Sequence, residues 1–288
     1  MSSMEGMVDI FGVVDADKPW REMLAKYEQI PLYDGEVPDY DESLGQRKPS
    51  ITFFRSNAEQ PRGCIVVMAG GSYTHKSVPE GEDVAKKLNE VGIHAAVLDY
   101  RVIPYAHSVI VGDAKRAVRY LRCHAEEFGI LPDKIGVEGF SAGGNLAAVT
   151  CFLGDDGDPN AADPVERVSS RPDAAVLGYA AINFVSEEDF DDDDDEFNIM
   201  KYFEFVYRDG MQFPPAFIWQ SMSDGLINYQ TSLDLCRTLK QKLNTPVEMH
   251  LFPYGDHGQA LADKGERADD LACVWGDLCN RWLLHYGF

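Results

Sequence analysis

Residues 134–152, KIGVEGFSAGGNLAAVTCF, place a glycine–any–serine–any–glycine motif between two expected elements. The run KIGVE at 134–138 favours a short strand, and the alanine-rich run after Ser141 favours a helix. The two glycines let the chain turn sharply at this junction. The stretch therefore predicts a nucleophile elbow, with the Ser141 hydroxyl at a helix N-terminus whose partial positive charge favours a developing anion. The alternative is a helix-capping serine in a glycine-rich turn.

On both sides of this motif, strand patterns alternate with helix patterns. The expected strands are 51–55, 64–68, 94–99, 134–138, 174–179, 216–220 and 247–252, and the expected helices are 82–91, 114–128, 141–152, 229–243 and 271–282. This alternation predicts an α/β fold, with one mostly parallel, twisted sheet covered by helices on both faces. Active sites of such sheets lie beyond the carboxyl ends of the strands.

The domain organisation follows from where the alternation stops. Residues 1–50 are rich in Pro, Gly, Asp and Glu, and they predict an irregular arm packed on a single domain at 51–288. Residues 180–213 are too long for a tight connection, so they predict a cap or lid over the strand ends. The run Asp191 to Asp195 is interpreted as a solvated acidic face of this lid. The aromatic residues of the lid form either the core of the lid itself or an aromatic pocket for a ligand; they are Phe197, Tyr202, Phe203, Phe205 and Tyr207.

Composition excludes several classes of function. The 288 residues hold 26 Lys and Arg against 48 Asp and Glu, a net charge of −22 that disfavours nucleic acid and anionic lipid as partners. No apolar run reaches the 18 residues of a membrane-spanning helix, and the N-terminus lacks a secretory signal pattern, so we expect a cytoplasmic protein. Most of the six cysteines stand in apolar runs, which indicates free thiols.

A serine nucleophile needs a base, and seven histidines are available. His257 follows the last expected strand in the loop PYGDHGQA, which suits the chain order serine, acid, histidine. His75 and His107 also follow expected strands and remain alternatives as the base or as pocket residues. The other four are interpreted as structural: His94, His124, His250 and His285.

The acid and the oxyanion hole complete the expected site. Asp224 lies just after the strand AFIWQ, where a carboxylate can orient the imidazole and stabilise its charged form. Asp256 is a rival, although side chains of adjacent loop residues rarely point at each other. The N–H of Ala142 is the expected first oxyanion donor, and the loop 69–73, AGGSY, is expected to supply the others.

Three segments together resemble a known group of enzymes. They are VVMAGGSYTHKSVPEGEDVAKKLNEVGIHAAVLDYRV at 66–102, DAKRAVRYLR at 113–122 and DKIGVEGFSAGGNLAA at 133–148. In combination they resemble the α/β-hydrolase esterases related to hormone-sensitive lipase, within the acetyl xylan esterase and carbohydrate acetylesterase branch, over roughly residues 45–285. The oxyanion motif of that group is usually H-G-G-G or P-G-G-G-Y, whereas here Ala69 and Ser72 replace its first and last positions.

The resemblance implies an α/β-hydrolase fold, a triad of Ser141, Asp224 and His257, and oxyanion donors at Gly71, Ser72 and Ala142. It also implies a serine esterase that removes acetyl groups from carbohydrate such as xylo-oligosaccharides, or one that cleaves hydroxycinnamoyl esters. The chemistry requires no metal or organic cofactor, and the expected partner is a small-molecule ester, with a homo-oligomer left open. The competing hypotheses are a small-peptide or formyl-amide hydrolase on the same fold, and a binding module that has lost catalysis.

Overall fold

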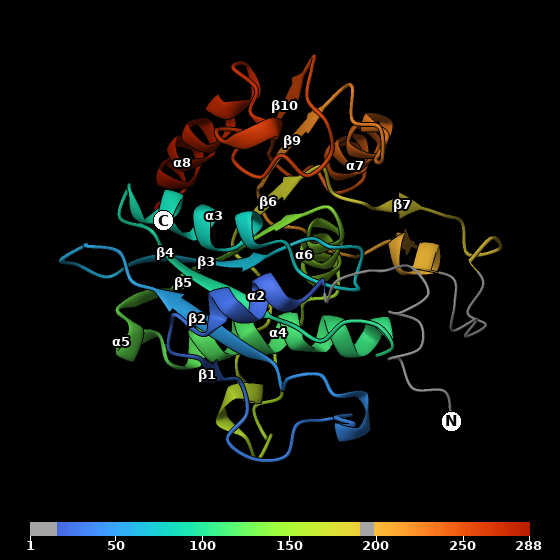
Figure 1. The fold of residues 1–288 in the computed structure, drawn as a ribbon. Coiled ribbons are helices and arrows are strands. Elements are labelled where there is room, and N and C mark those ends of the chain that lie inside the picture. The colour runs from blue at the N-terminus through green and yellow to red at the C-terminus, as the bar shows by residue number, and fades with distance from the viewer. Residues whose placement is uncertain (1–15, 191–198) are drawn as a thin grey trace.

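The computed structural model describes residues 16–190 and 199–288 and has an α/β architecture (Figure 1). The strands are β1 (Ile30–Pro31), β2 (Ser50–Phe54), β3 (Arg62–Met68), β4 (His94–Asp99), β5 (Ile130–Phe140), β6 (Ala175–Gly178), β7 (Asn183–Phe184), β8 (Glu204–Phe205), β9 (Ala216–Ser221) and β10 (Val247–Phe252). The α-helices are α2 (Lys18–Leu24), α3 (Glu82–Asn89), α4 (His107–Cys123), α5 (Ala125–Phe128), α6 (Ala142–Phe152), α7 (Tyr229–Lys242) and α8 (Trp275–His285). Short 3₁₀ helices span Glu42–Leu44, Val78–Glu80, Pro164–Arg167, Ile199–Phe203, Gly265–Arg267 and Ala272–Val274.

Eight strands form one sheet in the order β1-β2-β4-β3-β5-β6-β9-β10. All pairs from β4 to β10 are parallel, and only β1 and β2 run antiparallel to their neighbours. β9, β10, α7 and α8 gather at one end of the sheet, and β1 and β2 lie toward the other (Figure 1). This arrangement confirms the α/β-hydrolase fold expected from the sequence.

The largest differences between the element boundaries and the sequence expectation lie at the starts of three elements. Helix α4 begins at His107 rather than at 114, so His107 opens a helix instead of lying in a loop. Gly112 weakens the helical pattern there, but burial of Ile110 and Val111 outweighs this local preference. Strand β5 starts earlier, at Ile130, and α8 starts later, at Trp275.

The core has two layers because side chains of β3 alternate between the faces of the sheet. Cys64, Val66 and Met68 pack with residues of α4, α5, α6 and α7. Ile65 and Val67 pack on the opposite face with residues of α2, α3 and α8. Both sets are fully buried, as expected for a parallel sheet covered on both faces.

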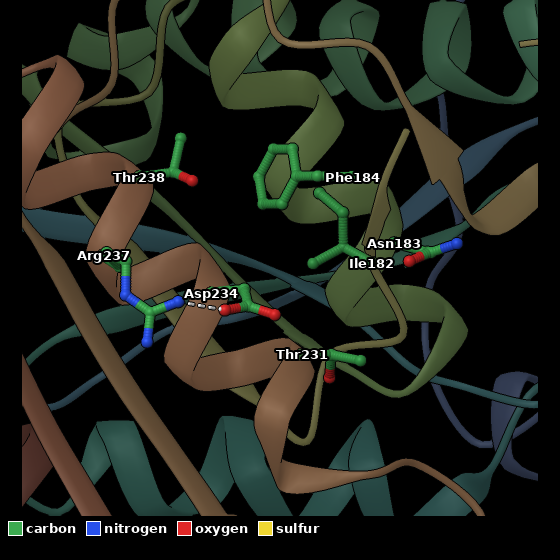
Figure 2. Close-up of a pocket in the computed structure, with 7 residues that line it drawn as sticks. All are labelled: Ile182, Asn183, Phe184, Thr231, Asp234, Arg237 and Thr238. Carbon is green, nitrogen blue, oxygen red and sulfur yellow. Dashed lines mark hydrogen bonds and ion pairs between the residues drawn. The ribbon is translucent and has the colours of Figure 1, made fainter. Parts of the chain in front are cut away.

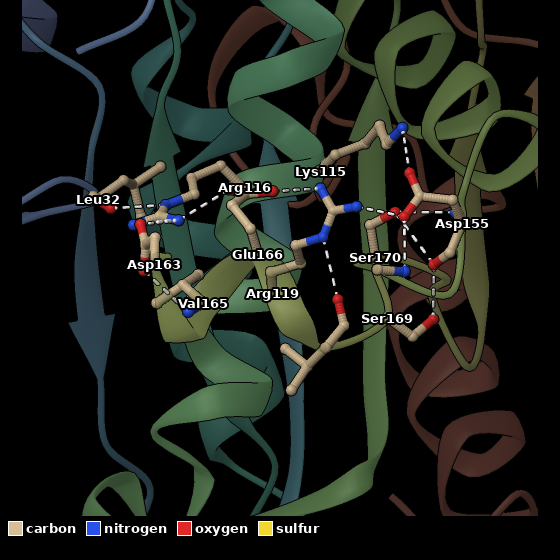
Figure 3. A network of polar contacts seen from close by, with 12 residues as sticks. Leu32, Lys115, Arg116, Arg119, Asp155, Asp163, Val165, Glu166, Ser169 and Ser170 are labelled. Atoms are coloured by element: carbon tan, nitrogen blue, oxygen red, sulfur yellow. Dashed lines mark hydrogen bonds and ion pairs between the residues drawn. The ribbon is translucent and has the colours of Figure 1, made fainter. Parts of the chain in front are cut away.

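Basic side chains of α4 anchor the segment that joins α6 to β6 (Figure 3). Arg119 pairs with Asp155, and its other nitrogen lies 3.1 Å from Glu166. Arg116 lies 2.8 Å from the same Glu166 carboxylate and donates to the Leu32 carbonyl at 2.8 Å. One charged cluster thus holds both this segment and part of the N-terminal arm against α4.

The described part of the N-terminal arm is anchored on Asp99, at the end of β4. Trp20 of α2 is fully buried, and its Nε1 donates to Asp99 at 2.9 Å. Arg47 lies 2.7 Å from the same carboxylate, and Lys76 lies 2.8 Å from it. Because Lys76 belongs to the loop after β3, the arm and that loop share one buried carboxylate.

The segment at 180–213 is described only in part. β7 and β8 pair in parallel, and the aromatic rings of Phe184 and Phe205 pack on Phe152 of α6. Phe205 is therefore part of the core beneath the lid. The run Asp191 to Asp195 and the side chain of Phe197 lie outside the described residues.

Two expectations from composition concern properties of the described chain. All six cysteines are free thiols, as expected. None of the helices at 16–190 and 199–288 combines the length and hydrophobicity that crossing a bilayer requires.

Asp99 provides a test of how the arm is held. Burial alone would raise the pKa of Asp99, but Lys76 and Arg47 outweigh burial and hold it at about 2. Asp99→Ala leaves the buried Lys76 ammonium unpaired, so we expect the free energy of unfolding at pH 7 to fall by about 3–5 kcal/mol in urea titrations. The stabilisation from the lowered pKa is present above pH ~4 and is lost as the pH falls toward 2, so the difference between the two proteins shrinks there.

The control is Asp133→Ala, because Asp133 is exposed on β5. Its effect should stay within about 0.5 kcal/mol. An Asp99→Ala protein as stable as the wild type at pH 7 would contradict the anchoring role of Asp99.

Candidate active site

Ser141 lies on the sharp turn between β5 and α6. Its backbone has φ 52° and ψ −119°, a conformation that residues other than glycine rarely adopt. A Cβ at Gly139 would lie 2.1 Å from the Gly143 carbonyl oxygen, and a Cβ at Gly143 would lie 2.0 Å from the Met68 carbonyl oxygen. At both flanking positions another stretch of backbone comes too close to leave room for a side chain. This explains why the motif has a glycine two residues before and two residues after the serine.

The backbone around Ser141 is fixed on both sides. The Ser141 N–H donates to the Gly178 carbonyl at 3.1 Å, and the Ser141 carbonyl accepts from the N–H groups of Asn145 and Ala181 at 3.0 Å each. The residue is 8% exposed, so the surrounding structure covers most of it. A strained residue held by three such bonds keeps its side chain in one place.

His257 connects the serine to a carboxylate. Its Nε2 lies 2.9 Å from Ser141 Oγ, and its Nδ1 lies 2.8 Å from Asp224 Oδ2. The loops that carry Asp224 and His257 are joined, since Ser221 and Ser223 both donate to the Gly255 carbonyl, at 2.8 and 2.9 Å. The structure thus brings together the three side chains that the sequence analysis selected from separate parts of the chain.

Asp224 is held in its charged form. Burial would raise its pKa, but hydrogen bonds from His257 and from the N–H groups of Ile227 and Leu226 outweigh burial and lower it. Its side chain is 1% exposed. The rival carboxylate, Asp256, instead accepts from the backbone N–H of His257 at 2.8 Å.

The loop after β3 turns its backbone toward the serine. Gly71, Ser72 and Tyr73 all have positive φ values, of 133°, 54° and 56°. A Cβ at Gly71 would lie 2.2 Å from the His75 carbonyl oxygen, so only glycine fits there. Within the described part of the chain, the N–H groups of Gly71 and Ser72 have no hydrogen-bond acceptor.

Ala142 is the first residue of α6, where backbone N–H groups are free and the helix dipole favours negative charge. The neighbouring Gly70 N–H is not free, because it donates to Glu80 at 2.7 Å. Among residues 16–190 and 199–288, the N–H groups of Gly71, Ser72 and Ala142 thus have no acceptor, whereas that of Gly70 is already used.

A group of aromatic side chains covers this loop. Tyr73 donates to Asn145 Oδ1 at 2.7 Å and lies 3.3 Å from His107 Nε2. The rings of Tyr202 and Phe203, from the lid segment, each pack 5.7 Å from the Tyr73 ring. Burial lowers the pKa of His107 to about 4, so His107 is neutral near pH 7. Its Nε2 contacts the Tyr73 hydroxyl rather than Ser141.

His75, the other alternative as the base, contacts Thr74 Oγ1 through Nδ1 at 3.0 Å. His94, which was interpreted as structural, accepts from the Ser56 N–H through Nδ1 at 3.0 Å. Among the residues that the structure describes, no group of three or more His, Cys, Asp or Glu side chains is arranged to hold a metal ion.

A cavity of about 300 Å³ lies between β7 and α7 (Figure 2). Its lining mixes polar and apolar surface in about equal parts and comprises Ile182, Asn183, Phe184, Thr231, Asp234, Arg237 and Thr238. It contains none of the three aligned side chains. The lining residue Ile182 directly follows Ala181, whose N–H donates to the Ser141 carbonyl.

Sequence reasoning missed Glu80 and Tyr179. Glu80 accepts from the Tyr179 hydroxyl at 2.8 Å, and the Tyr179 ring packs edge-on against His257 with centroids 5.0 Å apart. Tyr179 ends an apolar strand pattern and Glu80 stands in a polar loop, so neither position carried a signal of proximity to the site.

The sheet and the elbow define an α/β hydrolase with a serine-centred site. Residues 52–203, which are 152 of the 288, match the BD-FAE family. A solved structure, an acetyl ester-xyloside bifunctional hydrolase from Caldicellulosiruptor lactoaceticus, is 33% identical with a TM-score of 0.77, and the match covers 90% of this chain and 96% of that one. The chain therefore belongs to the BD-FAE family of α/β-hydrolase esterases.

Two curated relatives extend the comparison. Endo-1,4-beta-xylanase B of Butyrivibrio fibrisolvens is 28% identical over 229 residues, which are 75% of this chain and 35% of the relative. An acetylxylan esterase of Xylanibacter ruminicola is 29% identical over 203 residues, which are 69% of this chain and 42% of the relative. The chain thus spans about two fifths or less of the length of these curated relatives.

Gly143 provides a test of the elbow. In Gly143→Ala the new Cβ must displace β3 or the turn, so we expect labelling of Ser141 by a fluorophosphonate probe to slow at least ~100-fold, with a loss of stability of about 2 kcal/mol or more. The control is Gly112→Ala in α4, where a Cβ meets nothing within 4 Å. That change should keep the labelling rate and raise stability by up to about 1 kcal/mol. Normal labelling of Gly143→Ala would contradict the steric account.

Proposed function

We propose that the protein is a serine carboxylic-ester hydrolase that acts through Ser141, His257 and Asp224. The observation that supports this most directly is the unbroken hydrogen-bonded series from Ser141 Oγ through the imidazole to a buried carboxylate. A serine hydroxyl becomes an effective nucleophile when an adjacent base accepts its proton. A binding module derived from an esterase would have no reason to keep all three groups aligned.

In the proposed reaction, Ser141 Oγ attacks the ester carbonyl carbon while its proton passes to His257 Nε2. Asp224 accepts from Nδ1 and stabilises the imidazolium that forms. The carbonyl oxygen, now negatively charged, accepts hydrogen bonds from the N–H groups of Gly71, Ser72 and Ala142. His257 then protonates the departing alcohol, which leaves an acyl-enzyme. Water attacks this ester with His257 again as base, releasing the acid and restoring Ser141.

For the substrate, we propose acetyl esters of carbohydrate such as xylo-oligosaccharides. Two of the similar proteins support this, since one is described as an acetylxylan esterase and the other as an acetyl ester-xyloside hydrolase.

A second candidate is a hydroxycinnamoyl ester. The observation that favours it is the stack of Tyr73, Tyr202 and Phe203 over the oxyanion loop, since aromatic rings pair well with a planar acyl group. Peptide or formyl-amide cleavage uses the same catalytic groups and belongs in the same comparison.

Ser141→Ala should lower the kcat for p-nitrophenyl acetate by at least ~10³-fold, because no other group can form the acyl-enzyme. The variant should also fail to react with a fluorophosphonate probe. Ser43→Ala, at an exposed serine in the arm, is the matched control and should keep wild-type rates. Ester hydrolysis that persists in Ser141→Ala would refute the proposed mechanism.

A substrate panel tests the acyl and alcohol parts. We expect kcat/KM for acetylated xylo-oligosaccharides to exceed that for feruloylated oligosaccharides, peptides and formanilide by at least about tenfold, a difference of ~1.4 kcal/mol in transition-state binding. Mass spectrometry of the released acids measures this directly in a mixture, with Ser141→Ala as the blank. A preference for feruloyl esters would favour the second candidate instead.

A further inference from the structure

We propose that Glu80 is a positioning residue for this reaction, which ties the oxyanion loop to the histidine loop and adds a second negative charge behind His257. The inference rests on the proposed function, and it concerns a residue that does not touch the reacting atoms. Glu80 ends the 3₁₀ helix at Val78–Glu80 and is only 3% exposed.

One carboxylate oxygen of Glu80 holds the oxyanion loop. Oε2 accepts from the Gly70 N–H at 2.7 Å. The contact is tight, since a Cβ at Gly70 would lie 2.9 Å from Glu80 Oε2 and 2.9 Å from Ser141 Cβ. Gly70 immediately precedes Gly71 and Ser72, whose N–H groups are the expected oxyanion donors. By binding Gly70, Glu80 therefore fixes the position of the backbone just before these donors.

The other oxygen reaches the histidine loop through Tyr179. The Tyr179 hydroxyl donates to Glu80 Oε1 at 2.8 Å and accepts from the Ala260 N–H at 2.9 Å. Ala260 lies three residues after His257, and the Tyr179 ring supports the imidazole edge-on. A single carboxyl–phenol pair therefore connects the ends of β3 and β6 with the loop after β10.

The hydrogen bonds fit the ionised form of Glu80. Both oxygens accept from donors, whereas a protonated carboxyl would carry an O–H that faces these donors instead of an acceptor. On balance the pKa of Glu80 is raised above its ordinary value, because burial outweighs the opposing effects of Tyr179, Gly70, His257 and Arg267. Tyr100 also faces Glu80, and the charge of Glu80 helps to raise the pKa of that phenol.

A fixed negative charge near His257 favours the reaction. It attracts the positive charge of the imidazolium, and it thereby stabilises the imidazolium that forms in the transition state. Its loss should lower kcat and move the acid limb of the kcat/KM profile to lower pH. A residue that only supports the fold would change stability without moving that limb.

The decisive variant is Glu80→Gln, which keeps the size of the side chain and removes the charge. We expect kcat for p-nitrophenyl acetate to fall about tenfold, KM to stay within about twofold, and the acid limb to shift down by about one pH unit. The matched control is Glu138→Gln on β5. Glu138 is also buried, but burial raises its pKa to about 8, so the same substitution removes no charge below that pH. It should leave kcat and the limb unchanged.

The variant Tyr179→Phe separates the effect of the hydrogen-bonded link between the two loops from the effect of the Glu80 charge. It removes the link to Ala260 and keeps Glu80, so kcat should fall several-fold with little shift of the limb. A folded Glu80→Gln enzyme with wild-type kcat and limb, or with only KM raised, overturns the proposal. If Glu80→Gln does not fold, wild-type kcat in Tyr179→Phe overturns it. A wild-type protein without Ser141-dependent activity would instead overturn the proposed function itself.

Discussion

The position of Ser141 depends on how closely three pieces of backbone approach one another. Gly139 and Gly143 face each other across the turn, and Gly143 also lies against the end of β3, so neither position has room for a methyl group. This crowding forces the serine into a left-handed conformation at the start of α6. The histidine, the carboxylate and the oxyanion loop all take their positions relative to that one strained residue, on loops that follow three different strands.

Much of this arrangement could be predicted from local patterns. The buried strands read as apolar runs, and the elbow glycines mark a turn that needs backbone space, so the fold and Ser141 follow from sequence. Asp224 and His257 were selected because each follows a strand, and parallel strands place such residues at one edge. The structure places His257 within hydrogen-bond distance of Ser141, and Asp224 within hydrogen-bond distance of His257.

Other features depend on contacts between distant residues and leave no local trace. Glu80 and Tyr179 are separated by 99 residues, and nothing near either one predicts a buried pair. The start of α4 is similar, because Gly112 argues against a helix and only the burial of Ile110 and Val111 reverses that preference. The contacts of Trp20 and Arg47 with Asp99 could not be predicted either, because the polar composition of the arm does not indicate which of its residues pack against the sheet.

The shared carboxylate at Asp99 bears on how the protein can be engineered. Lys76 belongs to the same loop as the oxyanion residues and is nearly as inaccessible as the aspartate that neutralises it. A shortened form that began after Arg47 would lack the Trp20 indole and the Arg47 guanidinium that bind this carboxylate, and it would expose the loop after β3 to water on that side. Fusion partners and purification tags are therefore best joined ahead of Trp20, since the arm beyond that point is part of the catalytic scaffold.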